Sequence, residues 1–339
     1  MNPKHHEEDS MPTHLKRRDL LIAAGTSVLW GSTSAQVPLT GKVVKLFVGF
    51  PAGQATDMVT RVLAERLRAL TGDNYVVENR PGQGGSLALS QLAKSAPNGS
   101  TMMIAHMSAA ATNPHIYQTV GYDTLKDFEA VGLLGDLPFV LVCNPSLPVT
   151  NVKELIAYAK SHPDQLNNAS SGNGTVSHLA MEELKRKAGL KITHIPYKGS
   201  VAGLTDVISG NVSMALETAS AVKTHVESGR LRAIAAGSAK RLSGVFAQVP
   251  TLIEQGFADF TATTWLMALY PAGTPKATVN ATYSALSQLA GNSEFEQKLL
   301  SLGLLPRHSK SPEEAANYLR SEFINWGEIV KRSGLEKEV

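Results

Sequence analysis

The amino-acid sequence predicts an α/β fold with largely parallel sheets, built in two domains. Apolar runs of strand length alternate with amphipathic segments of helix length almost from end to end, which is the pattern of an α/β protein. Helix-capping residues and glycines separate these segments. Without a 35-residue leader, discussed below, 339 − 35 = 304 residues remain, which is too long for one ordinary core and suits two domains.

The first unit is a strand, a short loop and a helix. Val43–Phe50 is a nearly continuous apolar run, as expected for a strand covered on both faces. After the loop 51–55, Thr56 and Asp57 can cap a helix, which Gly72 is expected to end. The apolar face of this helix consists of Val59, Val62, Leu63, Leu67 and Leu70.

Further strands and helices follow the same logic along the chain. The strands are predicted at Tyr75–Glu78, Thr101–His106, Phe139–Cys143, Thr193–Tyr197, Val212–Glu217, Leu231–Ala236 and Thr264–Tyr270. Caps are predicted at Thr150 or Asn151, Thr175, Ser200, Thr274 and Ser311, and helix ends at Gly189 and Gly210. Pro275 and Pro312 follow two of these caps, Glu314 completes a capping box with Ser311, and the two long helices that begin there finish the chain.

Two similar segments predict how the domains are joined. Phe139–Pro148 and Leu266–Pro275 each run from an apolar strand through a proline-containing bend to a capped helix. We interpret them as the crossing strands of a hinge. Residues 1–35 are then a signal peptide, residues 36–142 with 256–339 form a discontinuous domain I, and residues 143–255 form domain II.

The N-terminal segment has the features of an export signal. A basic cluster, Lys16-Arg17-Arg18, precedes the apolar stretch Leu20–Trp30, and small residues before Gln36 supply a cleavage site. The cluster resembles a twin-arginine motif, so both Sec and Tat export remain open, and the true start is Met1 or Met11. We expect a soluble mature protein in the periplasm, because no later segment has the roughly 20 apolar residues that span a bilayer.

Charge and cysteine content exclude several classes of protein. The leader holds four basic and four acidic residues, so the mature net charge is 28 − 25 = +3. Lysines and arginines are scattered among acids, which argues against a nucleic-acid-binding stripe. Cys143 is the only cysteine, so an internal disulfide is impossible and we expect a small core residue there.

Three predicted loops between strands and helices are rich in small residues. They comprise residues 51–57, 106–112 and 170–178. Such loops expose backbone N–H groups at the carboxyl ends of strands, and the helix N-termini after them favour anions. Each loop taken singly can be a tight turn with a cap. Two in one domain and one in the other favour a binding cleft.

No motif in the chain predicts catalysis, a metal or a cofactor. The glycine-rich segment 82–86 lacks the lysine followed by serine or threonine with which a phosphate-binding loop ends. Residues 172–175 do not form the motif of a nucleophile elbow. The histidines lack metalloprotease spacing and no cysteine pair is present. We interpret His106, His178 and His194 as polar lining or surface residues rather than catalytic bases.

The order of short motifs resembles the extracytoplasmic receptors of tripartite tricarboxylate transporters, the TctC or Bug family. The resemblance covers nearly the whole mature chain. No single motif is decisive, but the number and order of the motifs together are highly specific. They are Phe50-Pro51-Ala52-Gly53 with Asp57, Val77-Glu78-Asn79-Arg80-Pro81-Gly82 with Gly84-Gly85, Pro97-Asn98-Gly99, Pro196-Tyr197-Lys198-Gly199, Gly210-Asn211-Val212, Val249-Pro250-Thr251 with Glu254 and Gly256, Trp265, and Pro271-Ala272-Gly273-Thr274-Pro275.

The resemblance implies a type II periplasmic-binding-protein fold, in which two Rossmann-like α/β domains joined by a hinge close as a Venus flytrap on a ligand cleft. It implies a monomer without catalysis that captures a small organic carboxylate and delivers it to the permease subunits of a tripartite transporter. Members similar to this chain hold a carboxylate on backbone amides and waters. Carried over, those positions are Ala52, Gly53, Asp57, Gly172, Asn173, Gly174 and Thr175.

Other residues complete the predicted ligand-binding set. Gln54 stands where the family commonly has glycine, and His106 where it has a small residue, so the pocket is expected to be reshaped there. Ser108 and His178 lie in the second and third loops. Glu217, at a strand end, would suit a ligand amino or amide group if it faces the cleft, and is otherwise a solvated carboxylate. The motifs 79–82 and 196–199 either fix turns or touch the ligand.

Two other functions are compatible with the same chain. A sensor subunit would bind the same ligand and present it to a membrane kinase. An α/β enzyme would use the cleft for chemistry, although no nucleophile, base and orienting group stand out as a set. The identity of the carboxylate does not follow from the sequence.

Overall fold

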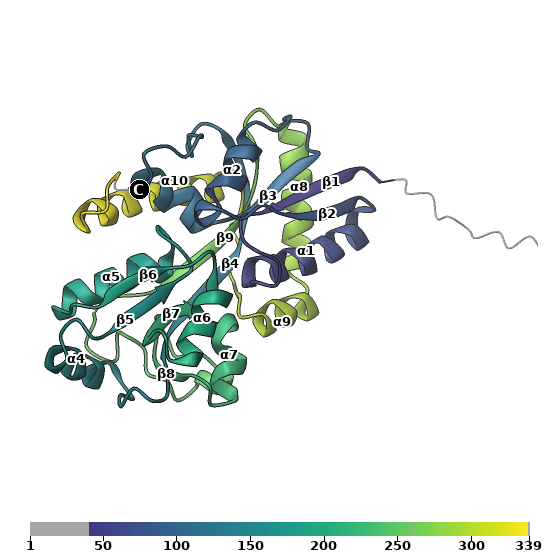
Figure 1. Ribbon diagram of the computed structural model, residues 1–339. Coiled ribbons are helices and arrows are strands. Elements are labelled where there is room, and N and C mark those ends of the chain that lie inside the picture. The colour runs from purple at the N-terminus through teal and green to yellow at the C-terminus, as the bar shows by residue number, and fades with distance from the viewer. Residues whose placement is uncertain (1–40, 259, 338–339) are drawn as a thin grey trace, which may run out of the picture. The chain divides into compact units, whose positions relative to one another are not determined.

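The protein is described by a computed structural model that covers residues 41–258 and 260–337. The predicted signal peptide lies outside these residues. No helix in the described ranges is long and apolar enough to cross a membrane. Figure 1 shows the arrangement of the helices and strands.

Two groups of strands share one long strand, β4 (Phe128–Cys143). The first group, here called the first lobe, contains β2 (Asn74–Asn79), β1 (Val43–Val48), β3 (Thr101–His106), β9 (Thr263–Pro271) and β10 (Leu305–Pro306). The second lobe contains β7 (Met214–Thr218), β5 (Asn167–Ser170), β6 (Thr193–Pro196) and β8 (Arg232–Ala236).

Each lobe is a mixed sheet, which corrects the expectation of largely parallel sheets. The strands β2, β1 and β3 pair in parallel, as do β6, β5 and β7. The strands β9 and β4 run antiparallel to their neighbours. The reason is topological, because a strand that leaves one lobe for the other does not return through a helical crossover.

Helices cover both faces of each sheet, and the burial of alternate strand residues explains why. On β3, Met102 and Ile104 pack with α1 (Ala55–Thr71), α8 (Lys276–Ala290) and α9 (Ser293–Ser301), whereas Met103 and Ala105 pack with α2 (Ser86–Ala93) and α10 (Pro312–Arg332). Successive side chains of a strand point to opposite faces, so a continuous apolar run is covered twice.

The second lobe repeats this arrangement. On β4, Val140 and Val142 pack with α6 (Ser200–Ser209) and α7 (Ala219–Glu227), whereas Leu141 and Cys143 pack with α4 (Val152–Ser161) and α5 (Val176–Ala188). The expected core position of Cys143 is confirmed, since this side chain is fully buried. The remaining helical turns are η1 (Gln83–Gly85), η2 (Ser108–Thr112), α3 (Asn113–Ile116) and η3 (Gly244–Phe246).

The chain crosses between the lobes at two neighbouring places. In β4 the last pairing with β9 is at Pro138, and the first with β7 is at Phe139. The return crossing lies at 237–262, where Gly237 N donates to Phe139 O at 2.8 Å and Ala262 N donates to Gly237 O at 2.7 Å. Leu266–Pro275, predicted as the second crossing strand, lies after this point. The domain limits at residues 143 and 256 stay a prediction.

Several predicted helix boundaries are confirmed and others are corrected. Asn151 and Ser311 cap their helices through their side chains, and Gly72, Gly189 and Gly210 end theirs in the left-handed conformation. The helices α1, α6 and α8 begin after Gln54, Gly199 and Pro275 instead of the predicted caps. Three helices rather than two finish the chain, because Gly291 separates α8 from α9.

Candidate functional site

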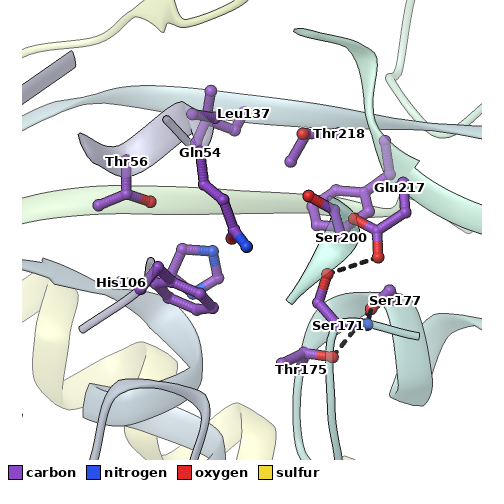
Figure 2. A pocket seen from close by; sticks show the side chains of 13 residues that line it. Gln54, Thr56, His106, Leu137, Ser171, Thr175, Ser177, Ser200, Glu217 and Thr218 are labelled. Atoms are coloured by element: carbon purple, nitrogen blue, oxygen red, sulfur yellow. Dashed lines mark hydrogen bonds between the residues drawn. The ribbon is translucent and has the colours of Figure 1, made fainter. Parts of the chain in front are cut away.

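Both lobes contribute to one cavity that opens to solvent, with about 390 Å³ of space not occupied by atoms when the adjoining open solvent is included. Its wall is mostly hydroxyl groups and aromatic or aliphatic side chains, and Figure 2 shows how they surround it. The lining residues are Phe50, Gln54, Ala55, Thr56, His106, Leu137, Phe139, Ser171, Thr175, Ser177, Ser200, Glu217 and Thr218. The site therefore lies at the carboxyl ends of β1, β3, β5 and β7, where ligands bind in open α/β sheets.

The first turns of four helices line this cavity. Ala55 and Thr56 begin α1, and Ser200 begins α6. Thr175 is the residue before α5, and Thr218 is the residue before α7. Helix N-termini carry unpaired N–H groups and the positive end of the helix dipole. Their convergence makes the cavity favourable for an anionic group without a lysine or an arginine.

Gln54 spans the gap between the lobes. Its side chain belongs to the loop before α1, and in Figure 2 its amide end lies between His106 and Ser200. A Cβ atom added to Gly199 would lie only 2.1 Å from Gln54 Nε2. The predicted reshaping of the pocket at Gln54 thus has a definite form, because the amide occupies space beside a glycine of the second lobe.

His106 is a buried, neutral donor and acceptor in the wall. The ring atom Nδ1 of His106 lies 2.8 Å from Ser108 Oγ and 3.2 Å from Ser108 N. The Phe50 ring lies beside it, with centroids 4.9 Å apart. Burial lowers the pKa of His106 to about 3, because the low-dielectric surroundings disfavour the imidazolium. This residue supplies no positive charge at neutral pH.

Among the described residues that line the cavity, Glu217 is the only one with a carboxyl group. The side chain is 3% exposed, and Ser171 Oγ donates to its Oε1 at 2.5 Å. Burial raises the pKa of Glu217 to about 7, although the Ser171 hydroxyl and neighbouring donors oppose the shift. The alternative of a solvated carboxylate is therefore wrong, and the group faces the cavity (Figure 2).

A chain of hydroxyl groups shapes the wall next to Glu217. Ser177 Oγ accepts from Ser171 N at 2.9 Å and lies 2.9 Å from Thr175 Oγ1. Thr175 Oγ1 also donates to Gly172 O at 2.6 Å. Its hydroxyl therefore fixes the loop 170–175, and it does not cap α5 through its side chain.

Asp57 does not line the cavity and holds the first loop in place. Its Oδ2 accepts from Gly53 N at 2.8 Å, and its Oδ1 accepts from Asn79 Nδ2 at 2.8 Å. Arg61 Nε donates to Oδ2 at 3.0 Å. Burial raises the pKa of Asp57, but the bonds from Arg61, Gly53 and Asn79 outweigh burial and lower it. With both oxygens engaged, this carboxylate is a structural clamp.

The other predicted residues are not among the described residues that line the cavity. Ala52 and Gly53 are exposed to solvent, and Ser108 Oγ donates to Gly84 O at 2.7 Å. The third loop connects the lobes through its carbonyl groups: Thr112 Oγ1 donates to Gly174 O at 2.7 Å, and Tyr117 OH donates to Asn173 O at 3.3 Å.

The structure places four of the predicted residues in the lining: Gln54, His106, Thr175 and Glu217. Sequence reasoning did not assign Ser171, Ser177, Ser200 or Thr218 to the site. A signal for them exists: Ser171 and Ser177 lie in the third predicted loop, Thr218 follows a predicted strand, and Ser200 was predicted to cap a helix. Polar residues at those points face a ligand in open sheets.

His178 lies near the third loop and forms a cluster with His194 and Glu182. Their potential ligand atoms lie within 4.8 Å of one another. The two rings stack, with centroids 4.0 Å apart and planes 15° apart, so their in-plane lone pairs cannot both point at one ion. Lys185 Nζ donates to Glu182 Oε1 at 2.6 Å. This cluster is packed as a hydrogen-bonded stack.

The chain is similar to a described family along most of its length. A family described as "Tripartite tricarboxylate transporter family receptor", TctC, matches residues 59–335. BugT of Bordetella pertussis is 32% identical over 292 residues, which cover 86% of this chain and 89% of BugT.

Two solved structures share the fold at similar sequence identity. The structure of Rpa4515 from R. palustris with adipate is 33% identical, has a TM-score of 0.82, and covers 86% of this chain and 97% of that one. MatC (Rpa3494) from Rhodopseudomonas palustris with bound malate is 28% identical, has a TM-score of 0.78, and covers 85% of this chain and 99% of that one. The predicted periplasmic-binding-protein fold is confirmed by the likeness to the structure of periplasmic binding protein BugD, which is 30% identical, has a TM-score of 0.80, and covers 87% of this chain and 98% of that one.

Proposed function

Because the chain belongs to the TctC family of tripartite tricarboxylate transporter receptors, we propose that it captures a small organic carboxylate and delivers it to the permease of such a transporter. The observation that carries this proposal is the convergence of the first turns of four helices on one cavity. N–H groups and hydroxyl groups satisfy a carboxylate at little cost in side-chain ordering.

The chemistry of similar proteins supports a carboxylate as the ligand class. One solved relative contains adipate and another contains malate, and both compounds are small carboxylic acids. In this chain the ligand contacts belong to the lining members of the predicted set, which are Gln54, His106, Thr175 and Glu217, together with the hydroxyls of Ser171, Ser177, Ser200 and Thr218.

Binding without turnover accords with the side chains of the cavity. Within the described part of the chain, no serine of the lining is hydrogen-bonded to a histidine: Ser171 donates to Glu217, and Ser177 pairs with Thr175. A serine nucleophile requires such a base. The protein acts in the periplasm as a monomer after export by its leader.

A thermal-shift screen of residues 36–339 tests the proposed ligand class. Carboxylates of three to eight carbons are compared with their uncharged amides. A ligand at about 100 times its dissociation constant stabilises the folded protein by about 2.7 kcal/mol, which is readily seen as a rise in Tm. Stabilisation by amides or sugars, with none by carboxylates, contradicts the proposal.

A further inference from the structure

Glu217 has an unusual position for an acidic residue in a cavity suited to anions. It is the last residue but one of β7, and Thr218 separates it from the start of α7. Its carboxyl group faces the space between the lobes (Figure 2). The lining that the structure describes contains no other carboxyl group and no lysine or arginine. In the described part of the chain Glu217 also takes part in no ion pair.

The Glu217 carboxyl group is held by uncharged neighbours of its own lobe. Oε1 accepts from Ser171 Oγ, and the Ser177 hydroxyl and the Thr218 N–H also act as donors toward the carboxyl group. The carboxyl group nevertheless lines the cavity and faces the space between the lobes. An accessible carboxylate oxygen at the wall of a binding cavity is an acceptor for a donor that the ligand brings.

The ligand therefore meets two different environments in one cavity. The first turns of α1, α5, α6 and α7 favour its anionic group. Glu217 favours a donor, and a positively charged donor most strongly, because charge-assisted hydrogen bonds are about twice as strong as neutral ones. A second carboxylate placed at Glu217 would instead meet a like charge, or would have to share a proton with it.

We propose that Glu217 determines ligand specificity and that the ligand is a carboxylate that also carries an ammonium group, an amino acid or another amino carboxylate. The ammonium group donates to the Glu217 carboxylate, and the ligand carboxylate is held by the helix N-termini and the hydroxyl groups. This inference rests on the proposed function, and it separates the chain from the relatives whose structures contain the dicarboxylates adipate and malate.

Matched ligands test the inference without any substitution. Isothermal titration calorimetry compares dicarboxylates from succinate to adipate with ω-amino acids and ω-amides of the same chain length, and with the L-α-amino acids. The best amino carboxylate is expected to bind at least tenfold more tightly than the dicarboxylate and the amide of its length. Equal or tighter binding of the dicarboxylates overturns the inference.

The variant Glu217→Gln tests the role of the residue. Glutamine keeps the shape and can still accept from Ser171, so the fold is preserved, and far-UV circular dichroism checks this. The variant is expected to bind the amino carboxylate at least tenfold more weakly and to lose the discrimination against dicarboxylates. Glu65→Gln, a matched change at an exposed residue of α1 outside the cavity, leaves all affinities unchanged.

The outcomes separate the two proposals. If carboxylates bind and Glu217→Gln leaves their ranking unchanged, the specificity role of Glu217 is wrong and the carboxylate receptor stands. If no carboxylate binds, with or without an ammonium group, the proposed function is wrong and the inference fails with it.

Discussion

Ser171 Oγ donates a 2.5 Å hydrogen bond to Glu217 Oε1. This contact joins the loop after β5 to the end of β7, so the carboxyl group is held in the cavity wall by a residue from a neighbouring strand end. A hydrogen bond to an ionised acceptor contributes about 1.5–3 kcal/mol, which is enough to keep the side chain in this orientation.

The substitution Glu217→Gln is expected to stabilise the unliganded protein at high pH. The pKa of Glu217 is raised from 4.5 to about 7, so between these values the unfolded chain releases a proton that the folded chain retains. The free energy of unfolding of the wild type therefore falls as the pH rises from 4.5 to 7. The variant does not lose stability in this way. Its free energy of unfolding relative to that of the wild type therefore rises over the same pH range, by up to about 3 kcal/mol.

Urea unfolding followed by tryptophan fluorescence at pH 4.5 and pH 8 measures this difference. If the difference in free energy of unfolding between variant and wild type is the same at both pH values, the raised pKa of the buried Glu217 carboxyl group is contradicted.

His178 is expected to make the protein less stable in acid. Burial lowers its pKa from 6.5 to about 4, and the positive charge of Lys185 acts in the same direction, while His194 and Glu182 pack beside it. The unfolded chain takes up a proton near pH 6.5 that the folded chain refuses, so the free energy of unfolding falls as the pH drops from 6.5 toward 4.

In the variant His178→Gln, the free energy of unfolding is expected to fall less between pH 6.5 and pH 4 than in the wild type. The difference between the two proteins changes by up to about 3 kcal/mol over this range. Glutamine keeps an acceptor for Gly174 N, which donates to His178 Nδ1 at 3.3 Å. Melting curves at half-unit pH steps measure the slope. Parallel curves for variant and wild type contradict the prediction, and the opposite slope expected for Glu217→Gln serves as an internal control.

Gly199 and Gln54 are expected to be energetically coupled. A Cβ atom at residue 199 would lie 2.1 Å from Gln54 Nε2, and the φ angle of 117° adds backbone strain. Gly199→Ala should therefore destabilise the protein, and a second change, Gln54→Gly, should relieve the steric part but not the strain. A double-mutant cycle by urea unfolding should give a coupling of about 0.5–3 kcal/mol. Additive effects would show that the Gln54 side chain moves away freely.

Asp57→Ala is expected to reduce stability more than it alters ligand selectivity. The substitution leaves Gly53 N, Asn79 Nδ2 and the Arg61 guanidinium without their shared acceptor. Donors left unsatisfied cost about 1–3 kcal/mol, and the half-exposed Arg61 guanidinium can be solvated, so Tm is expected to fall by a corresponding amount. Affinities for the carboxylate series are expected to fall by a common factor, because the residue lies outside the cavity. A change in the ranking of the ligands would place Asp57 in direct contact with them.

The strands with strong apolar runs could be predicted from the sequence. The predicted strand Thr101–His106 has the same limits as β3. The predicted strand Val43–Phe50 is two residues longer than β1. The strand β5 was not predicted, because Asn167-Asn168-Ala169-Ser170 has little β-propensity and is held by pairing with β6 and β7. The first half of β4 was not predicted either, since its two bulges against β9 interrupt the local pattern.

The candidate site was only partly predictable for a similar reason. The first and third loops were located between their strands and helices because their small residues and caps are local signals, whereas Ser108–Thr112 of the second predicted loop form the helical segment η2. Which of their residues line the cavity depends on the side-chain partners, and the sequence does not show these. Asp57 is turned into the loop by Gly53, Asn79 and Arg61, whereas Glu217 faces the cavity beside Ser171.

The sequence by itself determined the α/β class, most strands and helices, and the family, because periodicity, caps and motif order are properties of neighbouring residues. Only the tertiary structure decided the antiparallel pairing of β4 with β9, the convergence of four helix N-termini, and the position of Glu217 opposite Gln54. These features join residues that are far apart in the chain, and their energies depend on burial and on partners that no local pattern records.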